Sequence, residues 1–196
     1  MQIRPARLAD GAAAARLVLL AIEDIAFRLT GERTEAAVLA KLAEYYRTPG
    51  NRFSADRHAL LIADGGEPAG TFLCYGGDQA DALYAPIAER LRAEGFGDAV
   101  QDREADEDEY YIDAVAVFPA YQGRGFAKAL IRHAELEAAA RGYAAIALNV
   151  DIGKEYARAL YARLGFEEDK RIRINGHPYR HMRKALRVSS AHAAEF

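Results

Sequence analysis

Residues 110–142 read YYIDAVAVFPAYQGRGFAKALIRHAELEAAARG, and this stretch decides the fold. It predicts an apolar strand from Ile112 to Val117, a turn that contains Pro119, a glycine-bearing loop over Gln122–Gly125 and a long amphipathic helix. The first N–H groups of a helix have no partner within the helix, and the helix dipole adds partial positive charge there. A strand that enters a helix through such a loop therefore predicts an anion site, and we expect a ligand that carries phosphates.

On this pattern alone, a nucleotide, a dinucleotide and coenzyme A are all open as ligands. The chain has no GxxxxGK followed by Ser or Thr, so it lacks both the lysine and the metal-binding hydroxyl of a P-loop. Its GRGFAK segment over Gly123–Lys128 also misses the third glycine of GxGxxG, and it comes too late in the chain to open a Rossmann unit.

An ordered set of motifs resembles the GNAT superfamily of acyl-CoA-dependent N-acyltransferases. Gln122–Ala127 is similar to the family's Q/R-x-x-G-x-G/A loop, and Val115–Val117 is similar to the V-x-V strand end before it. Ala157–Phe166, ARALYARLGF, resembles the family's A-x-x-L-Y-x-x-x-G-F segment. The opening Ile3–Ala6 and a closing strand over Tyr179–Leu186 also fit, so the resemblance covers about residues 2–187.

The resemblance implies an α/β (α+β) fold. Its central sheet is expected to be mixed and mostly antiparallel, with about six to seven strands, a central parallel pair splayed around the coenzyme A site, and helices on both faces. We expect a single N-acetyltransferase domain over residues 1–187, with an insertion over 76–108 that contains a helix at Ala82–Glu94, and a flexible C-terminal tail at 188–196. The Asn175-Gly176 pair predicts a hairpin between the last two strands.

Composition narrows the class of protein. The chain has 196 residues, of which 51% are hydrophobic and 28% charged, as in globular domains. No apolar stretch is long enough for a membrane span, so a cytoplasmic location without membrane contact is expected. The net charge of −3 argues against nucleic acid as a partner. The single Cys74 excludes an internal disulfide framework, and the five histidines show no metal-ligand spacing, so no metal is expected.

The resemblance, together with the anion-site argument, implies acetyl-CoA as co-substrate. The backbone N–H groups of Gly123–Lys128 would hold the pyrophosphate, and the side chains of Arg124 and Lys128 would neutralise phosphates. The backbone of Val115 and Val117 would pair with the pantetheine amides like an added strand. Many family members carry Asn where this chain has Lys154, so that contact is expected to differ. The expected cofactor-binding residues are Val115, Ala116, Val117, Gln122, Gly123, Arg124, Gly125, Phe126, Ala127, Lys128, Lys154 and Tyr161.

The resemblance places Tyr161 as proton donor, or hydrogen-bond donor, to the departing thiolate. Glu109 and Asp113 alternate onto one face of the central strand together with Tyr111, so either carboxylate is a candidate general base. The alternatives are that these carboxylates bind substrate or are structural, with a water molecule acting in their place.

The acceptor site is expected beside the first two helices. Phe27, Tyr45, Tyr46 and Tyr111 are the candidate substrate-binding residues, and the alternative for the first three is that they pack the core. The acidic run over Asp102–Glu109 has two interpretations: a solvated loop, or a charged surface that draws a cationic amine toward the site.

We therefore expect an N-acetyltransferase that moves an acetyl group from acetyl-CoA to a primary amine, on a small molecule or on a protein N-terminus or lysine, by direct attack in a ternary complex. The alternative is a non-catalytic acyl-CoA-binding or regulatory module on the same fold. The expected partner is a small-molecule or peptide amine, and a homodimer through the last strands is a candidate assembly.

Overall fold

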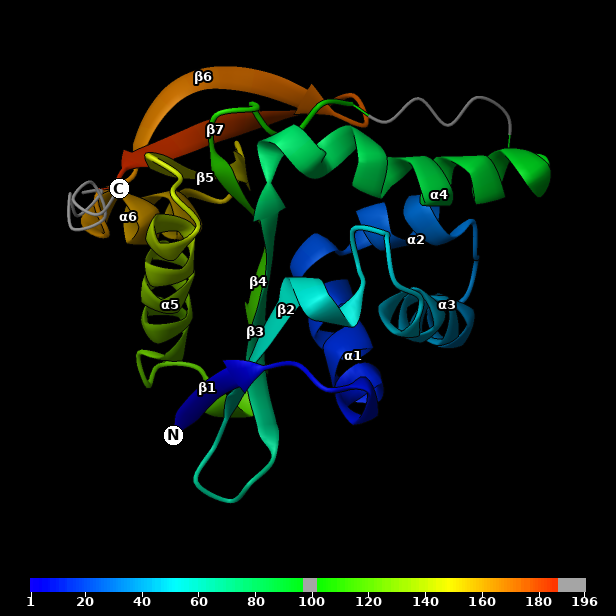
Figure 1. Ribbon diagram of the computed structural model, residues 1–196, viewed down its shortest axis with the longest axis horizontal. Coiled ribbons are helices and arrows are strands. Elements are labelled where there is room, and N and C mark those ends of the chain that lie inside the picture. Colours follow the sequence, from blue (N-terminus) through cyan, green and yellow to red (C-terminus); the bar gives the residue numbers. More distant parts are fainter. Residues whose placement is uncertain (97–101, 187–196) are drawn as a thin grey trace, which may run out of the picture.

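The computed structural model describes residues 1–96 and 102–186 and contains one seven-stranded sheet with the strand order β1-β2-β3-β4-β5-β7-β6 (Figure 1). All neighbouring strands are antiparallel except β4 and β5, which are parallel. This confirms the expected mixed sheet with one central parallel pair. The strands are β1 (Gln2–Pro5), β2 (His58–Ile62), β3 (Pro68–Gly76), β4 (Tyr110–Val117), β5 (Ala145–Asp151), β6 (Glu167–Ile174) and β7 (His177–Ala185).

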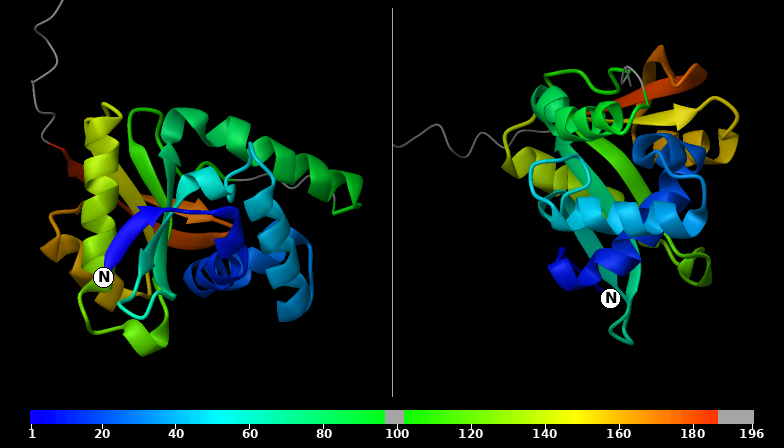
Figure 2. Two further views of the ribbon diagram at one scale, coloured as in Figure 1. Left: turned by 60° about the horizontal axis from the view of Figure 1, so that its bottom comes forward. Right: turned by 90° about the vertical axis from the view of Figure 1, so that its right-hand side faces the viewer.

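Helices cover both faces of the sheet (Figures 1 and 2). One face packs against the three N-terminal helices and α4, and the other face packs against α5. The helices are α1 (Gly11–Ile22), α2 (Asp24–Thr30), α3 (Glu35–Arg47), α4 (Ala80–Ala93), α5 (Phe126–Ala140) and α6 (Glu155–Arg163). Among the residues that the structure describes, no helix is long and apolar enough to cross a membrane.

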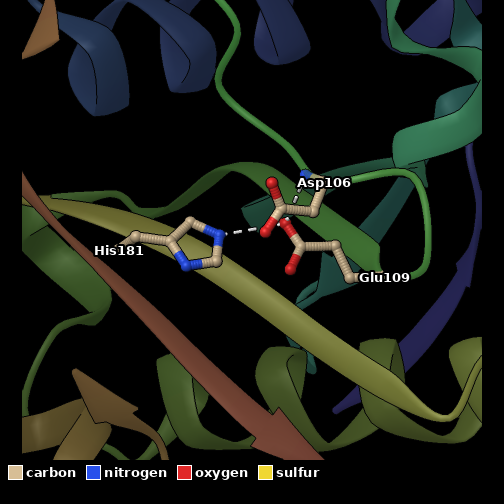
Figure 3. Close-up of side chains that lie close together, drawn as sticks. All are labelled: Asp106, Glu109 and His181. Atoms are coloured by element: carbon tan, nitrogen blue, oxygen red, sulfur yellow. Dashed lines mark hydrogen bonds and ion pairs between the residues drawn. The ribbon is translucent and has the colours of Figure 1, made fainter. Parts of the chain in front are cut away.

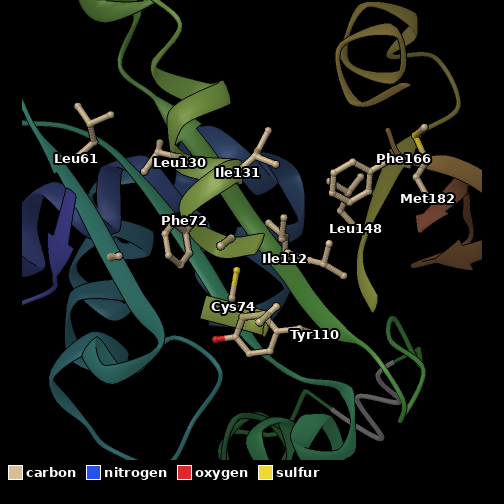
Figure 4. Close-up of a cluster of buried hydrophobic side chains, with 14 of the residues drawn as sticks. Leu61, Phe72, Cys74, Tyr110, Ile112, Leu130, Ile131, Leu148, Phe166 and Met182 are labelled. Atoms are coloured by element: carbon tan, nitrogen blue, oxygen red, sulfur yellow. The ribbon is translucent and has the colours of Figure 1, made fainter. Parts of the chain in front are cut away.

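The core on the α5 face explains why the strand–loop–helix unit folds as it does. Leu130, Ile131 and Ala134 recur at helical spacing on α5 and are fully buried against Phe72 and Ile112 of the sheet (Figure 4). Cys74 lies in the same cluster, where burial raises the pKa of its thiol, so it behaves as a small apolar side chain. This packing fixes where α5 begins relative to the end of β4.

Strands β4 and β5 pair over only three positions. Tyr110, Tyr111 and Ile112 lie opposite Ile146, Ala147 and Leu148, and the two strands diverge beyond that point. On its other side β4 stays paired with β3 as far as Val117, with a register shift that leaves Asp113 as an extra residue. A wedge therefore opens between β4 and β5 at the end where the glycine loop follows.

The connection between β3 and β4 contains a helix, α4, close to the predicted helix at Ala82–Glu94. The acidic segment after it is solvated only in part: the side chains of Glu107 and Asp108 are 75% and 69% exposed, whereas Glu109 is buried. Asp106 pairs with Lys170, Asp108 pairs with Arg183, and Asp102 accepts a hydrogen bond from the backbone N–H of Asn175. Basic residues of β6 and β7 therefore hold the acidic segment against the sheet. Residues 97–101 of the insertion and the tail expected at 188–196 lie outside the described residues.

A close approach of backbones anchors the beginning of this connection. The N–H of Gly77 donates to the carbonyl of Glu109 at 2.9 Å. A Cβ atom on Gly77 would come within 1.7 Å of the carbonyl oxygen of Asp106, so only glycine fits at this position.

Candidate functional site

A cavity of about 910 Å³ fills the wedge between β4 and β5. The glycine loop, α6, the break between α1 and α2, and the β6–β7 hairpin complete its walls. Most of the predicted site residues line it: Tyr111, Asp113, Val115, Ala116, Val117, Gln122, Gly123, Gly125, Phe126, Ala127, Lys128, Lys154 and Tyr161.

Five predicted site residues are not on the cavity wall: Phe27, Tyr45, Tyr46, Glu109 and Arg124. Tyr45 and Tyr46 are buried in the helical layer, where their hydroxyls donate to the carbonyls of Leu29 and Arg7, and Phe27 packs at the edge of the same layer. For these three residues the structure agrees with the core-packing alternative. Arg124 donates to the carbonyl of Ala120 and lies over the ring of Tyr121 instead.

The glycine loop leaves a row of backbone donors free. Gly123 and Gly125 have φ values of 74° and 77°, which L side chains rarely adopt, and the second of them is the N-cap of α5. The first helical hydrogen bond is donated by Ala129 to Gly125. None of the N–H groups from Gly123 to Lys128 donates to another residue in the described part of the chain. Six consecutive donors therefore face either solvent or a ligand, which is the arrangement that binds phosphate.

The loop is also tied back to the strand before it. The side-chain amide of Gln122 donates to the carbonyl of Val117 at 3.0 Å, and Tyr121 donates from its N–H to Phe118. These bonds hold the donor row at the open end of the wedge. The edge of β4 beyond Ile112 has no β5 partner, so its backbone is accessible from the cavity.

Tyr161 reaches the cavity from α6. Its ring packs edge-on against Phe166, with 6.0 Å between the ring centroids. Its hydroxyl makes no hydrogen bond to any residue that the structure describes. Burial raises the pKa of Tyr161 to about 12, so the phenol stays protonated and can act only as a hydrogen-bond donor or acid near neutral pH.

A buried arginine holds two carboxylates at the cavity wall. Arg52, whose side chain is 2% exposed, donates from Nε to Asp113 Oδ2 at 2.7 Å and also binds Oδ1 of the same carboxylate. It donates from its two terminal nitrogens to Glu104 at 3.1 and 3.3 Å. Tyr75 adds a third hydrogen bond to Asp113. Both oxygens of Asp113 are therefore occupied, which makes it a poor proton acceptor.

Glu104 differs from Asp113 in its environment. It accepts from Tyr111 at 3.0 Å in addition to Arg52. Burial raises the pKa of Glu104, Arg52 opposes that shift, and the nearby Asp113 adds to it, so that the pKa lies above its ordinary value. A carboxyl group with a raised pKa in a cleft is a candidate for proton transfer.

Asn149 supplies an unused acceptor. Its amide nitrogen donates to the carbonyl of Glu104 at 2.8 Å and to the hydroxyl of Tyr111 at 2.9 Å. Its Oδ1 is buried and has no hydrogen-bond partner among the described residues. Sequence reasoning missed Arg52, Glu104 and Asn149. The only signal was the acidic run, which predicted negative charge near the site but not which residue enters it.

Glu109 belongs to a separate cluster with Asp106 and His181 (Figure 3). One ligand atom from each of the three lies within 4.8 Å of the others, a spacing that a metal ion could use. His181, however, already lies between two carboxylates: Nε2 is 3.0 Å from Glu109 and Nδ1 is 2.6 Å from Asp169. Asp106 is paired with Lys170. The cluster is therefore a network of ion pairs that holds the acidic segment against β7. Glu109 binds His181 and does not line the cavity.

Comparison with known proteins agrees with this geometry. Residues 19–166 match the model of the acetyltransferase (GNAT) family. A solved structure described as an acetyltransferase is 31% identical, with 95% of this chain and 100% of that chain covered and a TM-score of 0.78. An N-acetyltransferase from Staphylococcus aureus Mu50 is 25% identical, with 93% and 100% covered and a TM-score of 0.76. Naa20 from Chaetomium thermophilum, in complex with a bisubstrate analogue, shares the fold at 16% identity, with 96% and 88% covered and a TM-score of 0.59. A search of curated proteins found no match.

The His181 network predicts a pH-dependent contribution to stability. Burial alone would lower the pKa of His181, but the hydrogen bonds to Glu109 and Asp169 outweigh it and raise the pKa. The stabilisation is therefore complete below the unfolded-state pKa of about 6.5 and is lost as the pH rises through the folded-state pKa. We expect the free energy of unfolding lost in His181→Gln, measured with urea, to be largest at acidic pH. The loss should shrink by roughly 1.4 kcal/mol for each unit by which folding raises the pKa.

Asp169→Asn is the matched variant, because it removes one of the two carboxylates and leaves the imidazole in place. It should weaken the pH dependence without abolishing it. A constant difference between wild type and His181→Gln from acidic to alkaline pH would contradict a protonated His181.

Proposed function

The chain belongs to the acetyltransferase (GNAT) family, and from that membership we propose that it transfers an acetyl group from acetyl-CoA to a primary amine by direct attack in a ternary complex. The observation that carries the proposal is the convergence of three features on one cavity. They are the free donor row of Gly123–Lys128, the unpaired edge of β4, and the hydroxyl of Tyr161.

Acetyl-CoA fits the shape and chemistry of the wedge. The free N–H groups from Gly123 to Lys128 would bind the pyrophosphate, and the positive end of the α5 dipole would favour its charge. Lys128 lies on the cavity wall and would neutralise one phosphate. The free backbone of β4 near Val115 would pair with the amides of the pantetheine arm as a further strand would. The side-chain amide of Gln122 already donates to the carbonyl of Val117, so we assign Gln122 to holding the conformation of the glycine loop.

The reaction has a simple balance. A C–N bond forms between the amine and the acetyl carbon, the C–S bond of the thioester breaks, the amine loses a proton, and the thiolate of coenzyme A gains one. The chain must therefore provide a proton acceptor near the amine and a hydrogen-bond donor near the sulfur. A free backbone N–H of β4 would polarise the thioester carbonyl.

Tyr161 would act at the sulfur. Its hydroxyl is free of other hydrogen bonds in the described part of the chain and is protonated, because its pKa is raised to about 12. A phenol with that pKa is a weaker acid than a thiol with a pKa near 8.5. Full proton transfer to the thiolate would therefore be uphill, so we assign Tyr161 to stabilising the thiolate by a hydrogen bond.

Glu104 would act at the amine. Glu109 does not line the cavity, and both oxygens of Asp113 are bound by Arg52 and Tyr75. Glu104 lies on the wall and has a raised pKa, which suits a group that must take up a proton. The free Oδ1 of Asn149 is on the same wall and would accept an N–H of the incoming amine.

Binding of acetyl-CoA is the first test. At about a hundred times its dissociation constant, acetyl-CoA should stabilise the protein by about 2.7 kcal/mol, seen as a rise in the thermal unfolding midpoint. Gly125→Trp should abolish the rise, because the new side chain would fill the space in front of the donor row. Gly142→Trp is the matched control: it has the same left-handed backbone (φ 85°) and open surroundings, but it lies outside the cavity wall. No rise in the wild type would refute acetyl-CoA as the ligand.

Removal of the Tyr161 hydroxyl tests the assignment at sulfur. Tyr161→Phe should lower kcat by about a hundredfold to a thousandfold, the range for loss of one donor to a developing charge. The dissociation constant of acetyl-CoA should change little, because the pyrophosphate is held elsewhere. Steady-state kinetics and calorimetry measure the two quantities separately. An unchanged kcat would rule out a role for the hydroxyl in the chemical step.

Replacement of Glu104 tests the assignment of the base. Glu104→Gln should lower kcat/KM by about a hundredfold or more and remove the acidic limb of the pH–rate profile, because the amide cannot accept the proton. Glu104→Asp should keep that limb with a smaller rate. Thermal unfolding without ligand serves as the control for folding, since Arg52 keeps Asp113 as a partner in both variants. If the acidic limb persists in Glu104→Gln, another group or a water molecule is the base.

A further inference from the structure

Carboxylates from separate segments of the chain line the cavity. Glu23 and Asp24 come from the break between α1 and α2, Asp151 from the end of β5, and Glu104 from the acidic segment, and all four line the cavity. The segments are distant in sequence, so no local pattern of residues indicates the cluster.

The positive charges on the cavity wall do not balance the negative ones. Arg52 is shared between Glu104 and Asp113, and Lys154 pairs with Glu23 at 2.9 Å. Lys128, the third lysine or arginine of the wall, lies next to the glycine loop. The wall thus carries five carboxylates and three cations, a formal excess of two negative charges.

Two of these carboxylates have no ion-pair partner within residues 1–96 and 102–186. Asp24 makes neither a hydrogen bond nor an ion pair there. Asp151 only accepts a hydrogen bond from the backbone N–H of Gly153 at 2.8 Å. Both are therefore available to a cation that enters the cavity.

Tyr179 also lines the cavity, and the charges of these carboxylates affect the pKa of its hydroxyl. The pKa of Tyr179 is raised to about 12, chiefly by burial, and the charges of Asp151, Asp24, Glu104 and Glu23 contribute in the same direction. The four carboxylates therefore lie close enough to Tyr179 for their charges to act on one hydroxyl.

We propose that the amine acceptor carries a second positive charge, and that Asp24 and Asp151 hold this second charge while the reacting amine lies at Glu104 and Asn149. This proposal rests on the proposed acetyl transfer. The matching chemistry is an aliphatic diamine or polyamine, and a peptide with a neighbouring basic side chain offers the same two charges. A one-signed field at a cleft concentrates a ligand of the opposite sign and selects the more highly charged ligand.

The test compares 1,4-diaminobutane with butylamine, which has the same carbon chain and one amine fewer. At low salt, kcat/KM for the diamine should exceed that for the monoamine by about tenfold or more, the lower end of what a one-signed field supplies. The ratio should fall as salt is raised, because exposed charges are screened over about 10 Å at 0.1 M ionic strength. The same kcat/KM comparison is made for two lysine-containing peptides, one with and one without a second basic side chain. Turnover of these peptides distinguishes a peptide acceptor from a small-molecule acceptor.

The double variant Asp24→Asn with Asp151→Asn should bring the ratio close to one. The double variant Glu35→Gln with Glu89→Gln is the matched control, because it removes the same net charge from exposed positions outside the cavity. It should leave the ratio as in the wild type. Equal use of diamine and monoamine by the wild type, or an equal loss of preference in both double variants, would overturn the proposal.

Calorimetry gives a second readout that needs no turnover. The diamine should bind more tightly than butylamine to the wild type, and this difference should vanish in the Asp24 and Asp151 variant. If acetyl-CoA binds but no amine is acetylated, the proposed function fails, whereas the diamine is still expected to bind more tightly. If amines are acetylated but the diamine and butylamine bind equally tightly, the proposed acetyl transfer stands and only the preference for a second positive charge is refuted.

Discussion

The structure depends on one constraint: β4 cannot remain paired with β5 beyond Ile112. Strand β3 holds β4 along its length on the other side, and the extra residue at Asp113 turns the strand locally. Strand β5 is in turn held by β7 along its whole length. Each of the two strands therefore follows its antiparallel partner, and a wedge opens between them. Because α5 follows β4 through the glycine loop, the free N–H groups at its beginning lie at the open end of that wedge.

Buried Arg52 holds two carboxylates on the wall of this wedge. One guanidinium group serves two carboxylates, and taking all three groups out of water is costly, so the cluster is weak as a source of stability. It acts by positioning, since the five donors of arginine hold Asp113 and Glu104 in fixed directions. Arg52 and Tyr75 saturate Asp113, but the wall carries five carboxylates and three cations, so the cavity is negative as a whole. A single ion-pair cluster thus saturates Asp113 and fixes Glu104 on the cavity wall.

The acidic segment connects this site to the far edge of the sheet. Side chains of β6 and β7 bind Asp106, Asp108 and Glu109. Glu104, earlier in the same segment, lies on the cavity wall. The alternation argument that placed Glu109 beside Asp113 failed for a physical reason. Glu109 precedes the first residue of β4, so the two-residue period of a strand does not apply to it. His181, which is 72 positions away, binds it instead.

The sequence by itself determined the features that depend on neighbours along the chain. The strand, glycine loop and helix of residues 110–142, and the turn at Asn175-Gly176, follow from side-chain period and from backbone conformations that glycine adopts readily. Only the tertiary structure decided which charges meet. Arg52 lies 61 positions from Asp113 and 52 from Glu104, and Lys154 lies 131 from Glu23. Such pairs depend on how strands and loops pack in space, and no local period or turn preference carries that information.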